Sequence, residues 1–236
     1  MAMVASIPPG RRVAMAWGVH LYTALGAVLG FMALSSVFAG DIKNAFGWLA
    51  AALAVDATDG AFARLVGVKR AIPWIDGDLL DNIIDYLNYV VVPVALLVRP
   101  GVLPAGSEPA AMLVLIASAY GFSRTDAKGM VEHYFQGFPS YWNIIAFYFF
   151  VLGSAPAVNL VVLLAFVALV FVPMRWLYPS RMEKLRALTI LLGLPWALMA
   201  VVMIARLPEP TPALAMVSLF YPLYYIIGSA LFHFKG

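Results

Sequence analysis

The 236-residue chain contains no cysteine. This absence excludes disulfide bonds, thiolate nucleophiles and cysteine-ligated zinc or iron–sulfur sites, so oxygen and imidazole are the remaining metal ligands. Charged residues are also scarce: they make up 11% of the sequence, whereas an average soluble domain has roughly a quarter. Apolar residues account for 64%. A chain of this composition cannot cover itself with a polar surface, which predicts that its surroundings are lipid.

Basic stripes with interleaved aromatic side chains, the usual sign of nucleic-acid binding, are absent from the sequence although the net charge is +3. We therefore expect no nucleic-acid partner. Apolar runs recur along the whole length without a large polar block, so we predict a single transmembrane domain over residues 1–236. Met1–Arg12 lacks a signal-peptide pattern and is predicted to be a retained cytoplasmic tail.

Eight apolar runs fit transmembrane helices, if some of them are short or tilted. Glycine- and proline-rich turns separate the runs. The sequence therefore predicts an all-α integral membrane protein with about eight transmembrane helices and both termini on one side. The predicted helices begin near Val13, Ile42, Asp78, Pro109, Ser140, Ala157, Lys184 and Pro212.

The distribution of lysine and arginine gives this topology an orientation. Cytoplasmic loops of membrane proteins carry most of the basic residues close to the membrane. If the N-terminus is cytoplasmic, only Lys43, Arg99 and Arg206 of the fifteen basic residues fall on the opposite side. We therefore predict a multi-pass protein with both termini in the cytoplasm.

Acidic residues are concentrated in one part of the chain. Half of the twelve lie between Asp56 and Asp85, and four of these fall inside or at the cytoplasmic ends of the second and third predicted helices. A charged residue at the centre of a membrane costs roughly 2.5–3.5 kcal/mol, so such residues need compensation. Bound divalent cations would supply it. The four residues are Asp56, Asp59, Asp81 and Asp85.

The spacing of these acids places them on two helical faces. Asp56 and Asp59 are three residues apart, and Asp81 and Asp85 are four residues apart, so each pair lies about one turn apart on its helix. The two pairs could face each other and form a pocket of hard oxygen ligands for Mg²⁺ or Mn²⁺. Arg64, two turns after Asp56, offers a planar set of donors for phosphate oxygens.

The motif as a whole resembles the signature of the CDP-alcohol phosphotransferases. It reads Asp56-Ala-Thr-Asp59-Gly60-Ala-Phe-Ala63-Arg64, then twelve residues, then Gly77-x3-Asp81-x3-Asp85. The resemblance implies a helical bundle of that family, with two divalent metal ions, Mn²⁺ or Mg²⁺. It also implies transfer of a phosphatidyl or related group from a CDP-linked donor to a hydroxyl acceptor, with release of CMP.

The stretch between Arg64 and Gly77 is longer than in most members of the family. In this respect, and in the segments His20-Leu-Tyr22-Thr23-Ala-Leu-Gly26 and Phe135–Asn143, the chain is similar to a bacterial branch that uses choline as the acceptor. This similarity implies CDP-diacylglycerol as donor, choline as acceptor, the bacterial inner membrane as location, a site facing the cytoplasm, and a homodimer.

Carried over onto this sequence, the resemblance assigns roles to individual residues. Asp85 would contact a metal and accept the proton of the acceptor hydroxyl. The metal ligands would be Asp56, Asp59, Asp81 and Asp85, and the CDP site would comprise Asp56, Asp59, Gly60, Ala63, Arg64 and Gly77.

Aromatic faces would recognise the quaternary ammonium group of choline. The candidates are Tyr22, Tyr86, Tyr89, Tyr141 and Trp142, although tyrosine and tryptophan are also common at membrane interfaces. His20 and His133 are interpreted as hydrogen-bonded packing residues without a catalytic role. The pair Gly26-x3-Gly30 indicates close helix packing, either within the chain or between subunits.

Two alternatives remain open from the sequence. A related CDP-alcohol phosphotransferase could use another acceptor, such as serine, and a phosphorylated acceptor would favour more basic residues around the pocket. A cation or proton transporter could also place carboxylates in the membrane. A transporter, however, favours acids spread through the membrane depth, whereas these acids gather near the cytoplasmic side.

Overall fold

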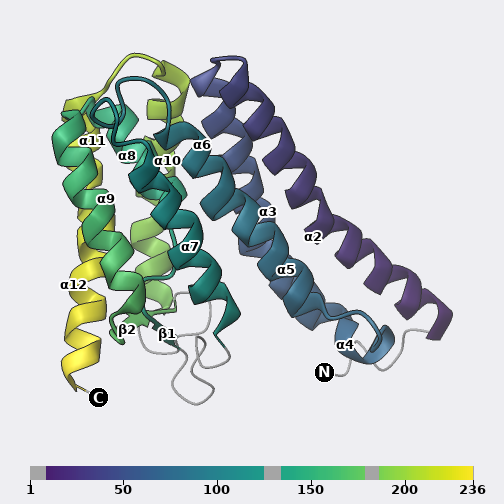
Figure 1. Ribbon diagram of the computed structural model, residues 1–236. Coiled ribbons are helices and arrows are strands. Elements are labelled where there is room, and N and C mark those ends of the chain that lie inside the picture. The colour runs from purple at the N-terminus through teal and green to yellow at the C-terminus, as the bar shows by residue number, and fades with distance from the viewer. Residues whose placement is uncertain (1–8, 125–133, 179–185, 236) are drawn as a thin grey trace. The chain divides into compact units, whose positions relative to one another are not determined.

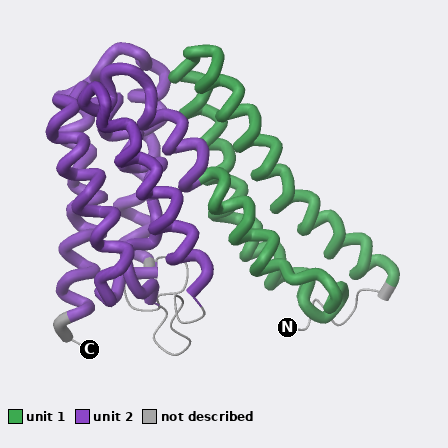
Figure 2. The backbone as a smooth tube through the Cα atoms, in the orientation of Figure 1, with its two compact units in different colours: residues 1–88 green, residues 89–236 purple. Residues whose placement is uncertain are grey.

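The computed structural model describes residues 9–124, 134–178 and 186–235, and these residues are predominantly helical (Figure 1). The predicted all-α fold is confirmed. The chain divides into two compact units, residues 1–88 and residues 89–236 (Figure 2). His133, the predicted helix start at Lys184 and the first eight residues of the predicted tail lie outside the described residues.

Unit 1, residues 1–88, contains the acidic motif. Its long helix α2 packs along α3 and also contacts α4 and α5. The Asp41 carboxylate accepts a hydrogen bond from the Asn44 N–H at 3.0 Å and so begins α3. Gly67, in the left-handed conformation (φ 71°), ends it. The helices of this unit are α2 (Pro9–Phe38), α3 (Ile42–Val66), α4 (Val68–Ala71) and α5 (Gly77–Tyr86).

The start of α5 is fixed by Asp76, whose carboxylate accepts hydrogen bonds from the backbone N–H groups of Asp78 and Leu79. This cap places Gly77 in the first turn, so that Asp81 and Asp85 follow at intervals of one turn each. A five-residue π-helix, η1 (Leu87–Val91), comes directly after α5.

Unit 2 is mainly helical and contains one small sheet. Strands β1 (Tyr134–Gln136) and β2 (Arg175–Leu177) pair antiparallel, with Phe135 opposite Trp176. Each strand has only three residues, too few to show a period-two pattern, so the sequence did not predict the pair. The helices are α6 (Val92–Leu97), α7 (Pro109–Ser123), α8 (Trp142–Leu152), α9 (Pro156–Phe171), α10 (Arg186–Arg206), α11 (Pro212–Ser218) and α12 (Phe220–Lys235).

Four helical segments among the described residues are long and apolar enough to cross a membrane. They are Gly10–Phe38, Gly77–Leu97, Ala187–Arg206 and Pro212–His233. Three shorter apolar helices, Pro109–Ser123, Trp142–Leu152 and Pro156–Phe171, coincide with further predicted spans. Helix α3 is 25 residues long, but its charged residues lower its hydropathy. The protein is therefore a helical membrane protein with four candidate spans, and the number eight stays a prediction.

Large apolar side chains are exposed on both units. Phe31 on α2, Val161 on α9 and Leu198 on α10 each expose about two-thirds of their surface (64%, 68% and 68%). Exposed apolar side chains spread over long helices are expected where the surrounding solvent is lipid. The interior of unit 1 contains small residues, including Ala16, Ala33 and Ala45, which are fully buried, together with larger apolar side chains.

The glycine pair on α2 makes a contact within the chain. A Cβ atom added at Gly26 would lie 2.7 Å from Ile84 Cγ2, and one added at Gly30 would lie 2.5 Å from Asn88 Oδ1. The Asn88 side-chain N–H donates to the Gly26 carbonyl oxygen at 3.0 Å. Of the two sequence interpretations of this pair, the structure therefore bears out packing within the chain.

Candidate metal and nucleotide site

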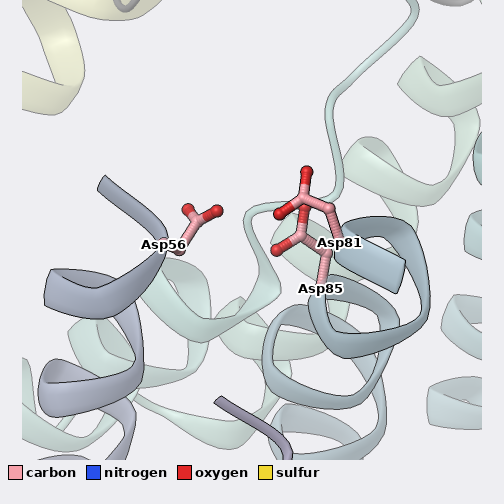
Figure 3. A group of neighbouring side chains, drawn as sticks. All are labelled: Asp56, Asp81 and Asp85. Carbon is pink, nitrogen blue, oxygen red and sulfur yellow. The ribbon is translucent and has the colours of Figure 1, made fainter. Parts of the chain in front are cut away.

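Three of the four predicted acidic residues come together in unit 1. Asp56 lies on α3, whereas Asp81 and Asp85 lie one turn apart on α5, and one carboxylate oxygen from each of the three lies within 4.8 Å of the others. Figure 3 shows the three carboxylates pointing toward a common centre. All three side chains are partly buried. We refer to Asp56, Asp81 and Asp85 as the acidic cluster.

The acidic cluster fits a divalent cation by the chemistry of its donors. Three carboxylates at this separation repel one another, and partial burial reduces the screening that water provides. The donors are all oxygen atoms, which Mg²⁺ and Mn²⁺ prefer over sulfur or nitrogen. These residues are therefore suited to hold a hard metal ion.

Asp59, the fourth predicted ligand, stands apart from the acidic cluster. Its side chain is buried, and its Oδ2 atom accepts a hydrogen bond of 2.8 Å from the Thr23 hydroxyl on α2. One residue earlier on each helix, the Tyr22 and Thr58 hydroxyls lie 2.8 Å apart. Two side-chain hydrogen bonds from α2 thus hold the acidic face of α3.

Thr23 is a site residue to which sequence reasoning gave no role. Thr23 and Asp59 are 36 positions apart, and no local pattern pairs them. The available signal was the segment His20–Gly26, in which polar His20 and Thr23 recur at helical spacing within an apolar run.

The predicted nucleotide-site residues occupy the last turns of α3 and the first turn of α5. Gly60 and Ala63 are partly buried, whereas Arg64 is exposed. A Cβ atom at Gly60 would lie 3.3 Å from Arg64 Nη1, so the guanidinium lies over bare backbone there. Gly77 is the first residue of α5.

The five candidate choline contacts do not share one unit. Tyr22 and Tyr86 are in unit 1, and the Tyr22 ring meets the Phe62 ring edge-on at 5.5 Å. In unit 2, the Tyr141 ring lies 6.1 Å from the Tyr89 ring. Trp142 is fully buried, and its indole N–H donates to the Ser118 hydroxyl at 2.8 Å.

Comparison with known proteins finds several relatives that share one name. The chain is 42% identical to a phosphatidylcholine synthase of Legionella pneumophila, over 91% of this chain and 87% of that protein. It is 37% identical to a phosphatidylcholine synthase of Pseudomonas aeruginosa, over 85% of this chain and 84% of that protein. It is 34% identical to one from Rhizobium johnstonii, over 94% of this chain and 92% of that protein. No family model matches the chain.

Proposed function

We propose, because the chain belongs to the phosphatidylcholine synthase family, that it transfers the phosphatidyl group of CDP-diacylglycerol to choline and releases CMP. The observation that carries this proposal is the convergence of Asp56, Asp81 and Asp85 on one centre. The relatives are phosphatidylcholine synthases by name, and the acidic cluster would provide carboxylates for metal-assisted transfer.

Asp56, Asp81 and Asp85 would hold divalent metal, with Asp59 as a further ligand and two Mn²⁺ or Mg²⁺ ions in all. Bound ions would offset the negative charge of the diphosphate and stabilise charge that develops on the departing CMP. The Thr23 hydroxyl, which donates to Asp59 Oδ2, would hold that carboxylate in a fixed orientation.

The reaction joins the choline oxygen to the phosphorus that carries the diacylglycerol. The bond between this phosphorus and the bridging oxygen of the diphosphate breaks, and CMP leaves with that oxygen. Asp85 would accept the proton of the choline hydroxyl. Because a carboxylate is a weak base in water, Asp85 would act through proximity and a fixed orientation.

The nucleotide would lie against the last turns of α3 and the first turn of α5. Arg64 would donate hydrogen bonds to phosphate oxygens through its planar guanidinium group. Small residues would let the ligand approach the backbone there. The proposed CDP site comprises Asp56, Asp59, Gly60, Ala63, Arg64 and Gly77.

Choline would be recognised by aromatic faces. Tyr22 and Tyr86, which belong to the same unit as the acidic cluster, are two of the five candidates, and the others are Tyr89, Tyr141 and Trp142. The buried hydrogen bond of Trp142 to Ser118 also gives that side chain a packing role.

We place the protein in the bacterial inner membrane as a homodimer, with the whole chain as one catalytic domain and with the active site and both termini facing the cytoplasm. The basic-residue distribution supports this orientation. Because the chain has no cysteine, single cysteines at the exposed positions Ala105 and Trp74 would report it by labelling. Ala105→Cys should react from outside intact cells, and Trp74→Cys only after the membrane is opened.

An acceptor assay tests the proposed function. Purified protein in lipid vesicles that contain CDP-diacylglycerol and Mn²⁺ should release CMP when choline is added. Serine at the same concentration is the control, since a related enzyme could use it. CMP release with serine and none with choline would show that the acceptor is wrongly assigned.

A further inference from the structure

His20 carries an unsatisfied polar atom in the interior of unit 1. The side chain lies on α2 and is 7% exposed, and its Nε2 atom is buried with no hydrogen-bond partner among residues 9–124, 134–178 and 186–235. Leaving a buried polar group unpaired destabilises a folded protein. Such atoms are uncommon in folded proteins, and a bound ligand is one explanation for them.

The ring of His20 packs against the motif. A Cβ atom at Gly77 would lie 3.3 Å from His20 Cε1, so the ring covers the bare backbone at the start of α5. Three residues further along α2, Thr23 donates to Asp59. Residues three apart share a helix face. His20 and Thr23 therefore link α2 to the two halves of the motif.

An apolar cluster includes a residue one turn before His20 on α2. One turn before it, Ala16 belongs to a buried cluster with Val66, Val68 and Ile72. Ala63, a residue of the proposed CDP site, packs against the same cluster. The side chains of this apolar cluster provide no hydrogen-bond partner for Nε2.

We propose that His20 binds the nucleotide part of the CDP-linked donor through Nε2. This inference rests on the proposed function. His20 contacts the α5 backbone at Gly77, eight positions before Asp85, which corresponds to about 12 Å along a helix. The contact is thus at the nucleotide end of α5, away from the residue proposed to activate choline. An imidazole nitrogen can donate to or accept from a nucleotide.

Two substitutions separate this role from packing. His20→Phe keeps an aromatic ring and removes the hydrogen-bonding atom, whereas His20→Gln keeps a polar atom near the position of Nε2. With CDP and Mn²⁺ as the probe, the Phe variant should bind CDP about tenfold more weakly than wild type, as expected for loss of one hydrogen bond. The Gln variant should retain most of the binding.

The readouts are the CDP-dependent rise in melting temperature and the kinetic constants. In the Phe variant, KM for CDP-diacylglycerol should rise by the same factor, while KM for choline stays unchanged. Without CDP, this variant should melt no lower than wild type, because an unsatisfied polar atom has been removed. A Phe variant that binds CDP as tightly as wild type would overturn the role of His20.

If the Phe variant does not fold, His20→Asn takes its place, since the shorter amide reaches only as far as Nδ1. Weaker CDP binding by the Asn variant than by the Gln variant supports the proposal, and equal binding overturns it. A wild-type protein that neither binds CDP nor releases CMP would instead overturn the proposed function, and the role of His20 with it.

Discussion

Asp85 is the residue with the largest expected effect on chemistry. Its carboxylate converges with those of Asp56 and Asp81, and we propose that it both contacts a metal ion and receives a proton. These two roles can be separated, because an amide of the same shape can still contact a ligand and cannot accept a proton at neutral pH.

Replacing Asp85 with Asn should therefore lower turnover at least about a hundredfold, the usual contribution of a general base. Binding of CDP should remain measurable, because the variant preserves the shape of the site. Turnover is measured as CMP release, and binding as the rise in melting temperature with CDP and Mn²⁺.

Asp78→Asn is the matched control for this substitution. Asp78 lies on the same helix, and its carboxylate is exposed and paired with Lys69 Nζ at 2.6 Å. An exposed ion pair of this kind contributes little to stability, so the control should keep wild-type turnover. Undiminished CMP release by Asp85→Asn would remove Asp85 from proton transfer.

At this scale, sequence reasoning predicted the residues of the acidic cluster better than their contacts. Helical spacing placed Asp81 and Asp85 on one face of their helix. The sequence also predicted that this face meets the acidic residues of α3. The bond between Thr23 and Asp59 joins residues of two helices, and helical periodicity does not specify such a partner. The unsatisfied Nε2 of His20 is likewise a property of the packed structure and has no sequence signal.

Helix α2 is the element that holds unit 1 together. It packs along α3 and contacts α4 and α5, and its buried face consists largely of small residues, including Ala16, Gly26, Gly30 and Ala33. Small side chains let helix backbones approach closely, which is how helices associate in lipid. The positions of α5 and of the start of η1 against α2 therefore depend on Gly26 and Gly30.

Gly30→Ala should destabilise the protein. The added methyl group would lie 2.5 Å from Asn88 Oδ1 and 2.8 Å from Leu87 Cδ2, so the buried Asn88 side chain and the partly buried Leu87 side chain would have to shift. Overpacking of this kind costs roughly 1–3 kcal/mol, and the melting temperature of the detergent-solubilised protein should fall.

Gly18→Ala is the control on the same helix, because a Cβ atom there would have no neighbour within 4 Å. Alanine favours a helix over glycine, so this variant should melt at or above the wild-type temperature. If both variants melt alike, the packing of the start of η1 against α2 does not depend on the close approach at Gly30.

The elements themselves were largely predictable. Apolar runs between glycine and proline turns predicted helix starts at Ile42 and Pro109, where α3 and α7 begin. The sheet of β1 and β2 was missed because three-residue strands leave no periodic pattern. The break between α11 and α12 was missed as well, since the apolar run from Pro212 continues across it.

The whole molecule divides its functional residues unevenly between the two units. The residues proposed to bind metal and nucleotide all lie within residues 20–85, in unit 1. Among the described residues, the acidic cluster is also the only group of three or more acidic or histidine side chains placed to hold a metal ion. Unit 2 contributes long apolar helices, two of which are candidate membrane spans.

We expect the acidic cluster to bind divalent metal and thereby to support transfer of the phosphatidyl group to choline. The most direct measurement is choline-dependent CMP release by chelator-treated enzyme in vesicles containing CDP-diacylglycerol, as Mn²⁺ is added back. We predict no release before Mn²⁺ is added, recovery as it is titrated in, and little recovery with Asp56→Asn or Asp81→Asn. Full activity of the chelated wild type, or equal recovery of both variants, would contradict the claim.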